Sequence, residues 1–198
     1  MQNFNVQKGW LILADRAYGT LTGIEHCLKA GANFVIRLRY GAFKLYDHNG
    51  VEINLFEKLK GVTCDTAMSF DVYVKLSIGL TKLRICATKI PNDKLEALEK
   101  RNKRKASKKQ RSTSTEALLM TQYVVLITAL PDMIPAVEIT SLYRFRWQIE
   151  IYFKRLKSII DFGNVPLRRE DSIFTWLNGK LLVSMLIEQM IGEVSFSP

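Results

Sequence analysis

The feature that most constrains the fold is a pair of apolar segments, WLILAD at 10–15 and FVIRLR at 34–39, with one helix-like stretch between them. An unbroken apolar run of this length is typical of a strand that is buried on both faces. The stretch between them, TGIEHCLKAGA at 22–32, has helical spacing, with Thr22 as the expected N-cap and Gly31 as the expected stop. A strand–helix–strand unit is usually parallel and right-handed, so we predict an α/β fold.

The end of the first strand carries the first candidate functional residue, Asp15. In open α/β sheets, ligands and catalytic groups usually lie at the C-terminal ends of the strands. The position of Asp15 therefore favours a binding or catalytic role for its carboxylate.

Hairpin patterns follow this unit. The segment FKLYDHNGVEINL at 43–55 predicts a hairpin around Asn49 and Gly50, the residue pair preferred in type I′ turns. Alternating segments at 68–76 and 82–90 predict a second antiparallel pair. We interpret this region as a β-rich insertion.

A basic stretch at 94–111 holds nine lysine or arginine residues against two glutamates. Two interpretations stay open, a solvated helix and an arm that contacts phosphates. A further buried-type strand is predicted at 123–128, and a proline-punctuated connection at 130–140 leads into a helix at 140–160. The last helix, at about 174–192, is mostly apolar and is expected to pack in the interior.

Composition narrows the class of protein. The chain has 198 residues, 47% of them hydrophobic, a net charge of +10 and a pI near 9.6, which points to a polyanion such as nucleic acid or an anionic membrane surface. The three cysteines show no metal-ligand or disulfide pattern, so we expect a reducing compartment. The N-terminus lacks a signal-peptide pattern, and the apolar run at 181–191 is too short to cross a membrane, so it is predicted to be a buried helix.

The helix at 140–160 contains the densest group of candidate residues, in the stretch YRFRWQIEIYFKRLK at 143–157. At 100° per residue, four of its side chains fall within an arc of roughly 60°. These four are Tyr143, Arg146, Glu150 and Lys157, and Trp147 and Lys154 flank them. Another side of the helix gathers the apolar residues Phe145, Ile149, Phe153, Leu156 and Ile160, which we expect to face the core.

This polar stripe has two interpretations. Glu150 and Lys154 form an ordinary i, i+4 pair on a solvated helix face. Alternatively, a carboxylate that binds Mg²⁺, cations that hold phosphates and aromatic rings that stack on bases suit a phosphodiester site. Geometry alone does not choose between them.

A family resemblance favours the second interpretation. The spacing Tyr-x2-Arg-x3-Glu-x6-Lys, at Tyr143, Arg146, Glu150 and Lys157, resembles the YREK signature of the IS-four insertion-sequence family of DDE (RNase H-like) transposases. The segment ADRAYG at 14–19 resembles the second acidic motif of that family. The resemblance covers essentially the whole chain, as the C-terminal portion of such an enzyme.

The resemblance implies a partial RNase H-like core interrupted by a β-rich insertion, with C-terminal helices. The implied segments are 1–40 (the second half of the RNase H-like sheet), 41–120 (the insertion with its basic helix) and 121–198 (the return strand, the YREK helix and the last helices). It also implies a bacterial protein of the cytoplasm and nucleoid that acts on transposon-end DNA. A second copy of the chain or an intact transposase would be its protein partner, and no membrane would be involved.

Residue roles follow from the same resemblance. Asp15 and Glu150 would be catalytic metal ligands for Mg²⁺, which Mn²⁺ can replace. The intact family uses two metal ions to cleave phosphodiester bonds and transfer strands. The DNA contacts would come from Tyr143, Arg146 and Lys157, with Trp147 and Lys154 beside them.

One departure from the family concerns its first catalytic aspartate. No carboxylate in the fourteen residues before Asp15 can serve as the first catalytic aspartate. We therefore expect a truncated reading frame that is inactive alone, with its first strand left at an exposed edge. The alternatives are a DNA-binding or regulatory remnant that inhibits or partners an intact transposase, and a basic structural protein of unrelated fold.

Overall fold

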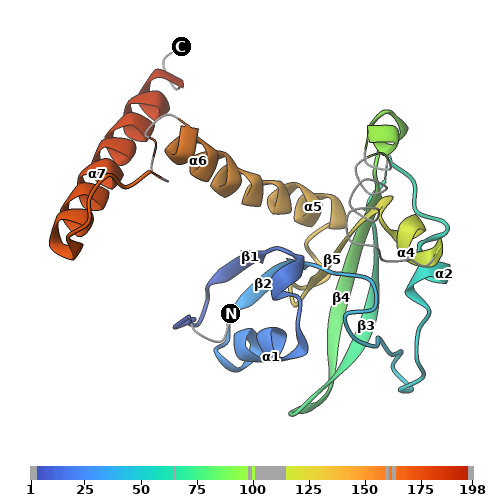
Figure 1. The fold of residues 1–198 in the computed structure, drawn as a ribbon. Coiled ribbons are helices and arrows are strands. Elements are labelled where there is room, and N and C mark those ends of the chain that lie inside the picture. The colour runs from blue at the N-terminus through green and yellow to red at the C-terminus, as the bar shows by residue number, and fades with distance from the viewer. Residues whose placement is uncertain are drawn as a thin grey trace. The chain divides into compact units, whose positions relative to one another are not determined.

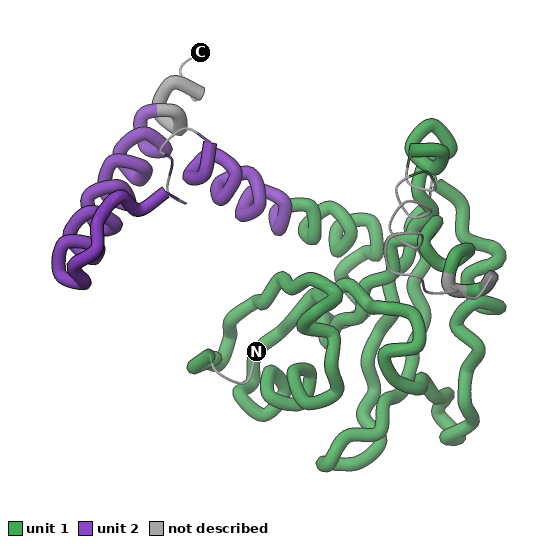
Figure 2. The backbone as a smooth tube through the Cα atoms, in the orientation of Figure 1, with its two compact units in different colours: residues 1–144 green, residues 145–198 purple. Residues whose placement is uncertain are grey.

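The computed structural model describes residues 4–64, 66–97, 100, 115–158, 161 and 164–195. The chain divides into two compact units, residues 1–144 and residues 145–198 (Figure 2). The division predicted from the sequence differs, because it was based on family motifs and not on compact units. Its segments, 1–40, 41–120 and 121–198, stay predictions. Most of the basic stretch at 94–111 lies outside the described residues, although 92–97 are helical.

Unit 1 is built on one five-stranded sheet with the strand order β1-β2-β5-β4-β3 (Figure 1). Its strands are β1 (Leu11–Ala14), β2 (Asn33–Arg37), β3 (Met68–Leu76), β4 (Gly79–Lys89) and β5 (Tyr123–Thr128). β1 and β2 are parallel, whereas the other neighbours are antiparallel. The predicted parallel pair, the β3–β4 hairpin and the strand at 123–128 are confirmed, and β1 lies at the edge of the sheet as expected.

Besides the helical stretch at 92–97, seven helical elements accompany these strands among the described residues. Unit 1 contains the 3-10 helix η1 (Arg16–Tyr18), α1 (Leu21–Lys29), α2 (Leu55–Leu59), α4 (Thr115–Met120) and α5 (Ala136–Arg144). Unit 2 contains α6 (Arg146–Ser158) and α7 (Glu170–Ser195).

The ends of α1 show why it forms where it does. The N-cap is Thr20, whose hydroxyl accepts the N–H of Gly23 at 3.1 Å. The expectation that Thr22 caps this helix was therefore wrong by two residues. Gly31 was correctly predicted as the stop, because its φ of +68° favours glycine.

Strand alternation gives unit 1 two apolar cores. On β2, Phe34 and Ile36 belong to one core, and Val35 between them belongs to the other. The first core also includes Ile24 of α1 and Leu59 of α2. The second core includes α5, through the residues Ala136, Ile139 and Tyr143. Both faces of the sheet are therefore covered, which explains the unbroken apolar runs in the central strands.

The predicted hairpin at 43–55 forms around Asn49 and Gly50. Tyr46 and Glu52 form a bridge, and the N–H groups of Asp47 and Ile53 donate to the carbonyls of Val51 and Leu45 at 2.9 and 2.8 Å. Tyr46 also forms a bridge with Tyr73 of β3, so the segment lies along the edge of the sheet. Asn54 ends the extended stretch, because its side chain accepts the N–H groups of the first turn of α2 at 3.0 and 3.4 Å. The helix N-cap therefore limits the length of the second arm of the hairpin.

The single helix predicted at 140–160 is two helices, and the first begins inside the predicted connection at 130–140. The carbonyl of Pro135 accepts the N–H groups of Glu138 and Ile139 at 3.0 and 3.2 Å, which starts α5. A turn at Phe145 separates α5 from α6, and the boundary between the two units falls beside it. Proline at the start of a helix is favourable, because its missing N–H would have no helical acceptor there.

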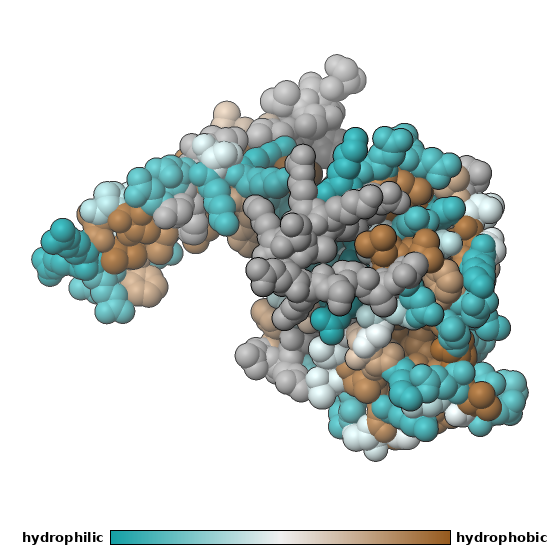
Figure 3. All heavy atoms as spheres, turned by 45° about the vertical axis from the view of Figure 1, so that its right-hand side comes forward, coloured by the Kyte–Doolittle hydropathy of each residue, from teal (hydrophilic) through white to brown (hydrophobic). Residues whose placement is uncertain are grey.

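The apolar faces of unit 2 are more open than the sequence suggested. Phe145, Ile149 and Phe153 were expected in a core but are 55–57% exposed, whereas Leu156 is buried and Ile160 lies outside the described residues. The predicted burial of 181–191 was also wrong, because Met185 is 65% exposed. Hydrophobic residues reach the surface of this unit, at the left of Figure 3.

The contacts within unit 2 explain this exposure. The hydroxyls of Tyr152 and Ser184 lie 2.9 Å apart, and Arg155 donates to Glu188 at 2.8 Å. These polar contacts join α6 to α7. Two helices cannot cover the whole circumference of an apolar helix, so much of α7 stays open within its own unit.

Candidate functional site

Asp15 stands where the sequence places it, directly after β1. It occupies the N-cap position of η1, and its carbonyl accepts the N–H of Tyr18 at 2.9 Å. Its side chain is half-buried and does not cap η1. A carboxylate that is not used for capping is available for another ligand.

The turn after Asp15 lies close against β2. A Cβ atom on Gly19 would come within 3.3 Å of the carbonyl oxygen of Arg37. β1 and β2 run parallel with Ala14 beside Ile36, so Asp15 lies at the C-terminal edge of this strand pair. The edge expected to carry function therefore carries a carboxylate.

Glu150 lies on α6 and has a defined partner in Arg146. The guanidinium of Arg146 donates to the carboxylate at 2.6 Å, and the Arg146 side chain is 12% exposed. The solvated-helix interpretation expected Glu150 to pair with Lys154, four residues later. Glu150 pairs instead with Arg146, four residues earlier. Arg146 also lies 5.7 Å from the ring of Trp147, so cation, carboxylate and aromatic ring form one group.

Three further predicted DNA contacts lie on α6. Trp147 is 49% exposed, and Lys154 and Lys157 are also exposed. Exposed lysines beside an exposed aromatic ring are suited to a polyanion, because lysines attract phosphates and the ring can stack on a base.

Tyr143, which was predicted to contact DNA, lies on α5 and not on α6. It belongs to α5 in unit 1, is 5% exposed and is part of the core that includes Val35 and Leu126. The stripe predicted from one continuous helix therefore does not extend to Tyr143, because the turn at Phe145 intervenes. The sequence held a signal for this placement: Ala136, Ile139 and Tyr143 follow the i, i+3, i+7 spacing of a packing face.

The donor chemistry of Asp15 and Glu150 fits a divalent metal. Carboxylate oxygens are the ligands that Mg²⁺ prefers, and the carboxylate of Asp15 is not used to cap its helix. Across the residues that the structure describes, however, no three His, Cys, Asp or Glu side chains gather as a metal site. Each of the two residues fits the chemistry of the ion.

Arg84 is a structural residue that the sequence reasoning did not single out. It is 6% exposed on β4, and its guanidinium donates to the carbonyls of Pro131 and Ile134 at 3.1 and 2.7 Å and to the hydroxyl of Ser69 at 3.0 Å. These bonds fix the loop that leads from β5 into α5. The signal was a lone arginine inside the strand pattern KLRICATKI.

Comparison with known proteins identifies the family of this chain. The family model for the transposase DDE domain matches residues 2–186. The transposase for insertion sequence element IS421 of Escherichia coli is 27% identical over 194 residues, which cover 94% of this chain and 52% of that protein. The transposase for insertion sequence element IS231F of Bacillus thuringiensis subsp. israelensis is 36% identical over 93 residues, 45% of this chain and 20% of that protein.

The family match thus extends along most of the chain. It accompanies a mixed α/β fold, an acidic residue at a strand end and a second acidic residue on a later helix. The chain belongs to the transposase DDE domain family. It spans about half the length of the IS421 transposase. Within the described part of the chain, no helix is long and apolar enough to cross a membrane.

Proposed function

We propose that this chain acts on DNA in transposition, as part of an RNase H-like transposase that cleaves phosphodiester bonds and transfers strands. The observation that carries the proposal is the family match over residues 2–186, a range in which both Asp15 and Glu150 lie. Asp15 stands at a strand end and Glu150 on a helix, positions from which carboxylates can project into a site.

Each candidate residue has a role in this proposal. Asp15 and Glu150 hold divalent ions, Mg²⁺ or in its place Mn²⁺. Such ions, when bound, stabilise the charge on the entering and leaving oxygens of the phosphate. Arg146 orients the carboxylate of Glu150 through the 2.6 Å bond between them.

The DNA contacts of the proposal come from α6. Lys154 and Lys157 hold phosphates of a transposon end, and Trp147 stacks on a base or a sugar. Arg146, which also donates a hydrogen bond to Glu150, supplies a further contact with the DNA. Tyr143 was predicted to contact DNA, but its burial supports a different role, in which it holds α5 against the sheet.

We further propose that a polypeptide of these 198 residues binds DNA but does not transfer strands by itself. One observation supports this: the chain aligns with only 52% of the IS421 transposase. Such a polypeptide would act together with an intact transposase, as its partner or its inhibitor.

DNA binding is tested by fluorescence anisotropy over a series of salt concentrations. Changing both Lys154 and Lys157 to Ala should weaken binding and reduce the slope of log K against log salt by about 2. The matched control changes Lys58 and Lys60 of unit 1 to Ala, which should leave the slope unchanged. Equal slopes for the two double variants would contradict the assignment of DNA contacts to α6.

Strand transfer is tested on linear DNA that carries the terminal repeats flanking this gene, with Mg²⁺ or Mn²⁺. The 198-residue chain should bind these ends and yield no joined product. Robust joining that is lost in Glu150→Ala would refute the partial-site proposal and would support Glu150 as a catalytic residue.

A further inference from the structure

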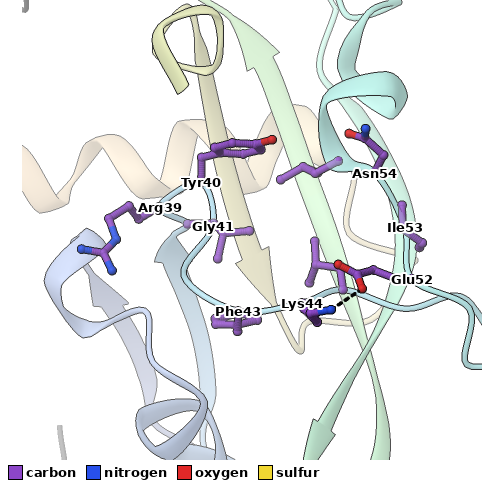
Figure 4. Close-up of a pocket in the computed structure, with 11 residues that line it drawn as sticks. Arg39, Tyr40, Gly41, Phe43, Lys44, Glu52, Ile53 and Asn54 are labelled. Carbon is purple, nitrogen blue, oxygen red and sulfur yellow. Dashed lines mark hydrogen bonds and ion pairs between the residues drawn. The ribbon is translucent and has the colours of Figure 1, made fainter. Parts of the chain in front are cut away.

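A pocket in unit 1 and the outer side of α7 have no role in the proposed function. The pocket, of about 570 Å³, lies between the segments 38–45 and 52–55 (Figure 4). The lysine and the glutamate of its lining are already paired, because Lys44 donates to Glu52 across it at 2.6 Å. The outer side of α7, by contrast, is apolar and exposed within its own unit.

The outer apolar face of α7 lies in the C-terminal half of this helix. Its position follows from Ser184, which is 3% exposed and lies against Tyr152 of α6, with 2.9 Å between the two hydroxyl oxygens. At 100° per residue, four side chains that are 52–65% exposed fall within an arc of roughly 140° on the side opposite Ser184. These four residues form the outer apolar face: Leu182, Met185, Leu186 and Met190.

The area of this face is large for a single helix. With the flanking Leu181 and Val183, six side chains between 181 and 190 are 37–65% exposed. If each offers on the order of 100 Å² at these fractions, they total about 600 Å², the upper end of what a typical monomer leaves in one patch. Two such faces together give about 1,200 Å², the lower end of the range for specific protein–protein interfaces. The area therefore suits a reversible association between two copies.

The chemistry of this face does not suit DNA. The segment 181–190 contains no lysine or arginine, although the chain carries a net charge of +10. Its single charged residue, Glu188, pairs with Arg155 of α6 at 2.8 Å. A phosphate backbone is bound by cations, whereas the core of a protein–protein interface is apolar and poor in charge.

The N-terminal half of the same side of α7 is polar. Asp171, Thr175 and Asn178 are exposed and fall within the same arc. A parallel, in-register pair of α7 helices would bring the two copies of Asp171 together, and like charges repel. An antiparallel pair centred on Leu186 keeps both polar halves in water, and it also places the two helix dipoles in opposite directions.

We propose that two copies of this chain associate through the outer apolar face of α7, packed antiparallel about a two-fold axis at Leu186. The same residues contribute from each copy, as in any interface on a two-fold axis. Leu186 meets its own counterpart, and Leu182 of each copy meets Met190 of the other. This association is independent of the proposed function, since it needs neither DNA nor a metal ion.

Sedimentation velocity on the full chain without DNA measures the association over a series of protein concentrations. The wild type should pass from monomer to dimer as the concentration rises. Changing both Leu182 and Leu186 to Glu places like charges together at the axis and should weaken dimerisation tenfold or more. The control is Val137→Glu in α5, because Val137 is also an apolar helix residue and is 56% exposed. It should dimerise as the wild type does, and all variants should keep the helical circular dichroism of the wild type.

Disulfide formation tests the antiparallel arrangement. The background is Cys64→Ser, which removes the exposed cysteine and leaves Cys27 and Cys86, both buried. Chains with Leu182→Cys are mixed with differently tagged chains with Met190→Cys and are then oxidised. The mixed disulfide should form in preference to either self-pairing, because each cysteine faces the other across the axis.

A wild type that stays monomeric at the highest concentration tested would overturn the inference, and so would a double glutamate variant that dimerises equally well. Self-pairing of Leu182→Cys without the mixed disulfide would show a parallel pair and would overturn the antiparallel arrangement. A monomer in which Leu182→Cys resists alkylation would show that another part of the same chain covers the face, which would also overturn the inference. Because these measurements contain no DNA, their outcome is separate from that of the DNA-binding test above.

Discussion

Replacing Arg84 with methionine tests how the loop between β5 and α5 is held. The arginine is 6% exposed, and its three hydrogen bonds of 2.7–3.1 Å join β4 to Ser69 on β3 and to the loop carbonyls of Pro131 and Ile134. Methionine retains the apolar stem and removes every donor. The loop would then be held by its own backbone contacts, by packing and by the ion pair between its Asp132 and Lys82 at 3.6 Å.

The expected loss follows from these contacts. The carbonyl of Pro131 keeps the N–H of Ile134 at 3.1 Å, whereas the carbonyl of Ile134 loses its 2.7 Å donor from Arg84. An unsatisfied buried acceptor costs about 1–3 kcal/mol, and each hydrogen bond to a charged group contributes about 1.5–3 kcal/mol. Methionine offsets part of this loss of stability, since no charge has to be buried in the variant. We expect a net loss of about 2–4 kcal/mol.

Thermal and urea unfolding measure this loss. A change of this size should lower the melting temperature by about 4–16 °C for a chain of this length. The matched control is Lys82→Met, on the same strand and facing the same way, because Lys82 is 50% exposed and pairs with Asp71 at 2.9 Å. That variant should stay within about 1 kcal/mol of the wild type. Equal melting temperatures for the two variants would refute the reasoning.

Two further predictions concern titratable groups in unit 1. Contacts with Lys29 and Ser77 lower the pKa of Glu25 from 4.5 to about 2, so its stabilising contribution is present above pH 4.5 and is lost as the pH falls toward 2. Melting temperatures between pH 2 and pH 5 should therefore fall more steeply for the wild type than for Glu25→Gln, and parallel curves would contradict this. Burial raises the pKa of the Cys86 thiol to about 11, whereas Cys64 is exposed. Alkylation at pH 8, followed by mass spectrometry, should label Cys64 well before Cys86, and comparable rates would show that the sheet opens readily.

The sequence predicted the central sheet well, because its signals there are local and strong. Continuous apolar runs marked β1, β2 and β5, and alternation marked β3 and β4. The position of Asp15 at a strand end followed directly from where the first run stopped. Motif spacing indicated the family that the match over residues 2–186 shows.

The sequence predictions were less accurate for features that depend on tertiary contacts. One continuous helix and a helix with a turn at Phe145 differ little in local pattern, so Tyr143 was placed on a polar stripe although it packs in a core. The hairpin at 43–55 forms, but the cap that Asn54 provides keeps its second arm short, and Tyr46 also forms a bridge with Tyr73. The ion pair of Glu150 formed with Arg146 rather than with Lys154, a choice that spacing alone cannot make.

The most direct test of the central claim is a count of the Mn²⁺ ions that the chain binds in the presence of DNA, measured by electron paramagnetic resonance. We predict that Asp15→Asn and Glu150→Gln each lower the bound Mn²⁺. Glu188→Gln should not, although Glu188 also pairs with an arginine in unit 2, at 2.8 Å. Unchanged Mn²⁺ binding in both Asp15→Asn and Glu150→Gln would contradict the assignment of these two carboxylates as metal ligands.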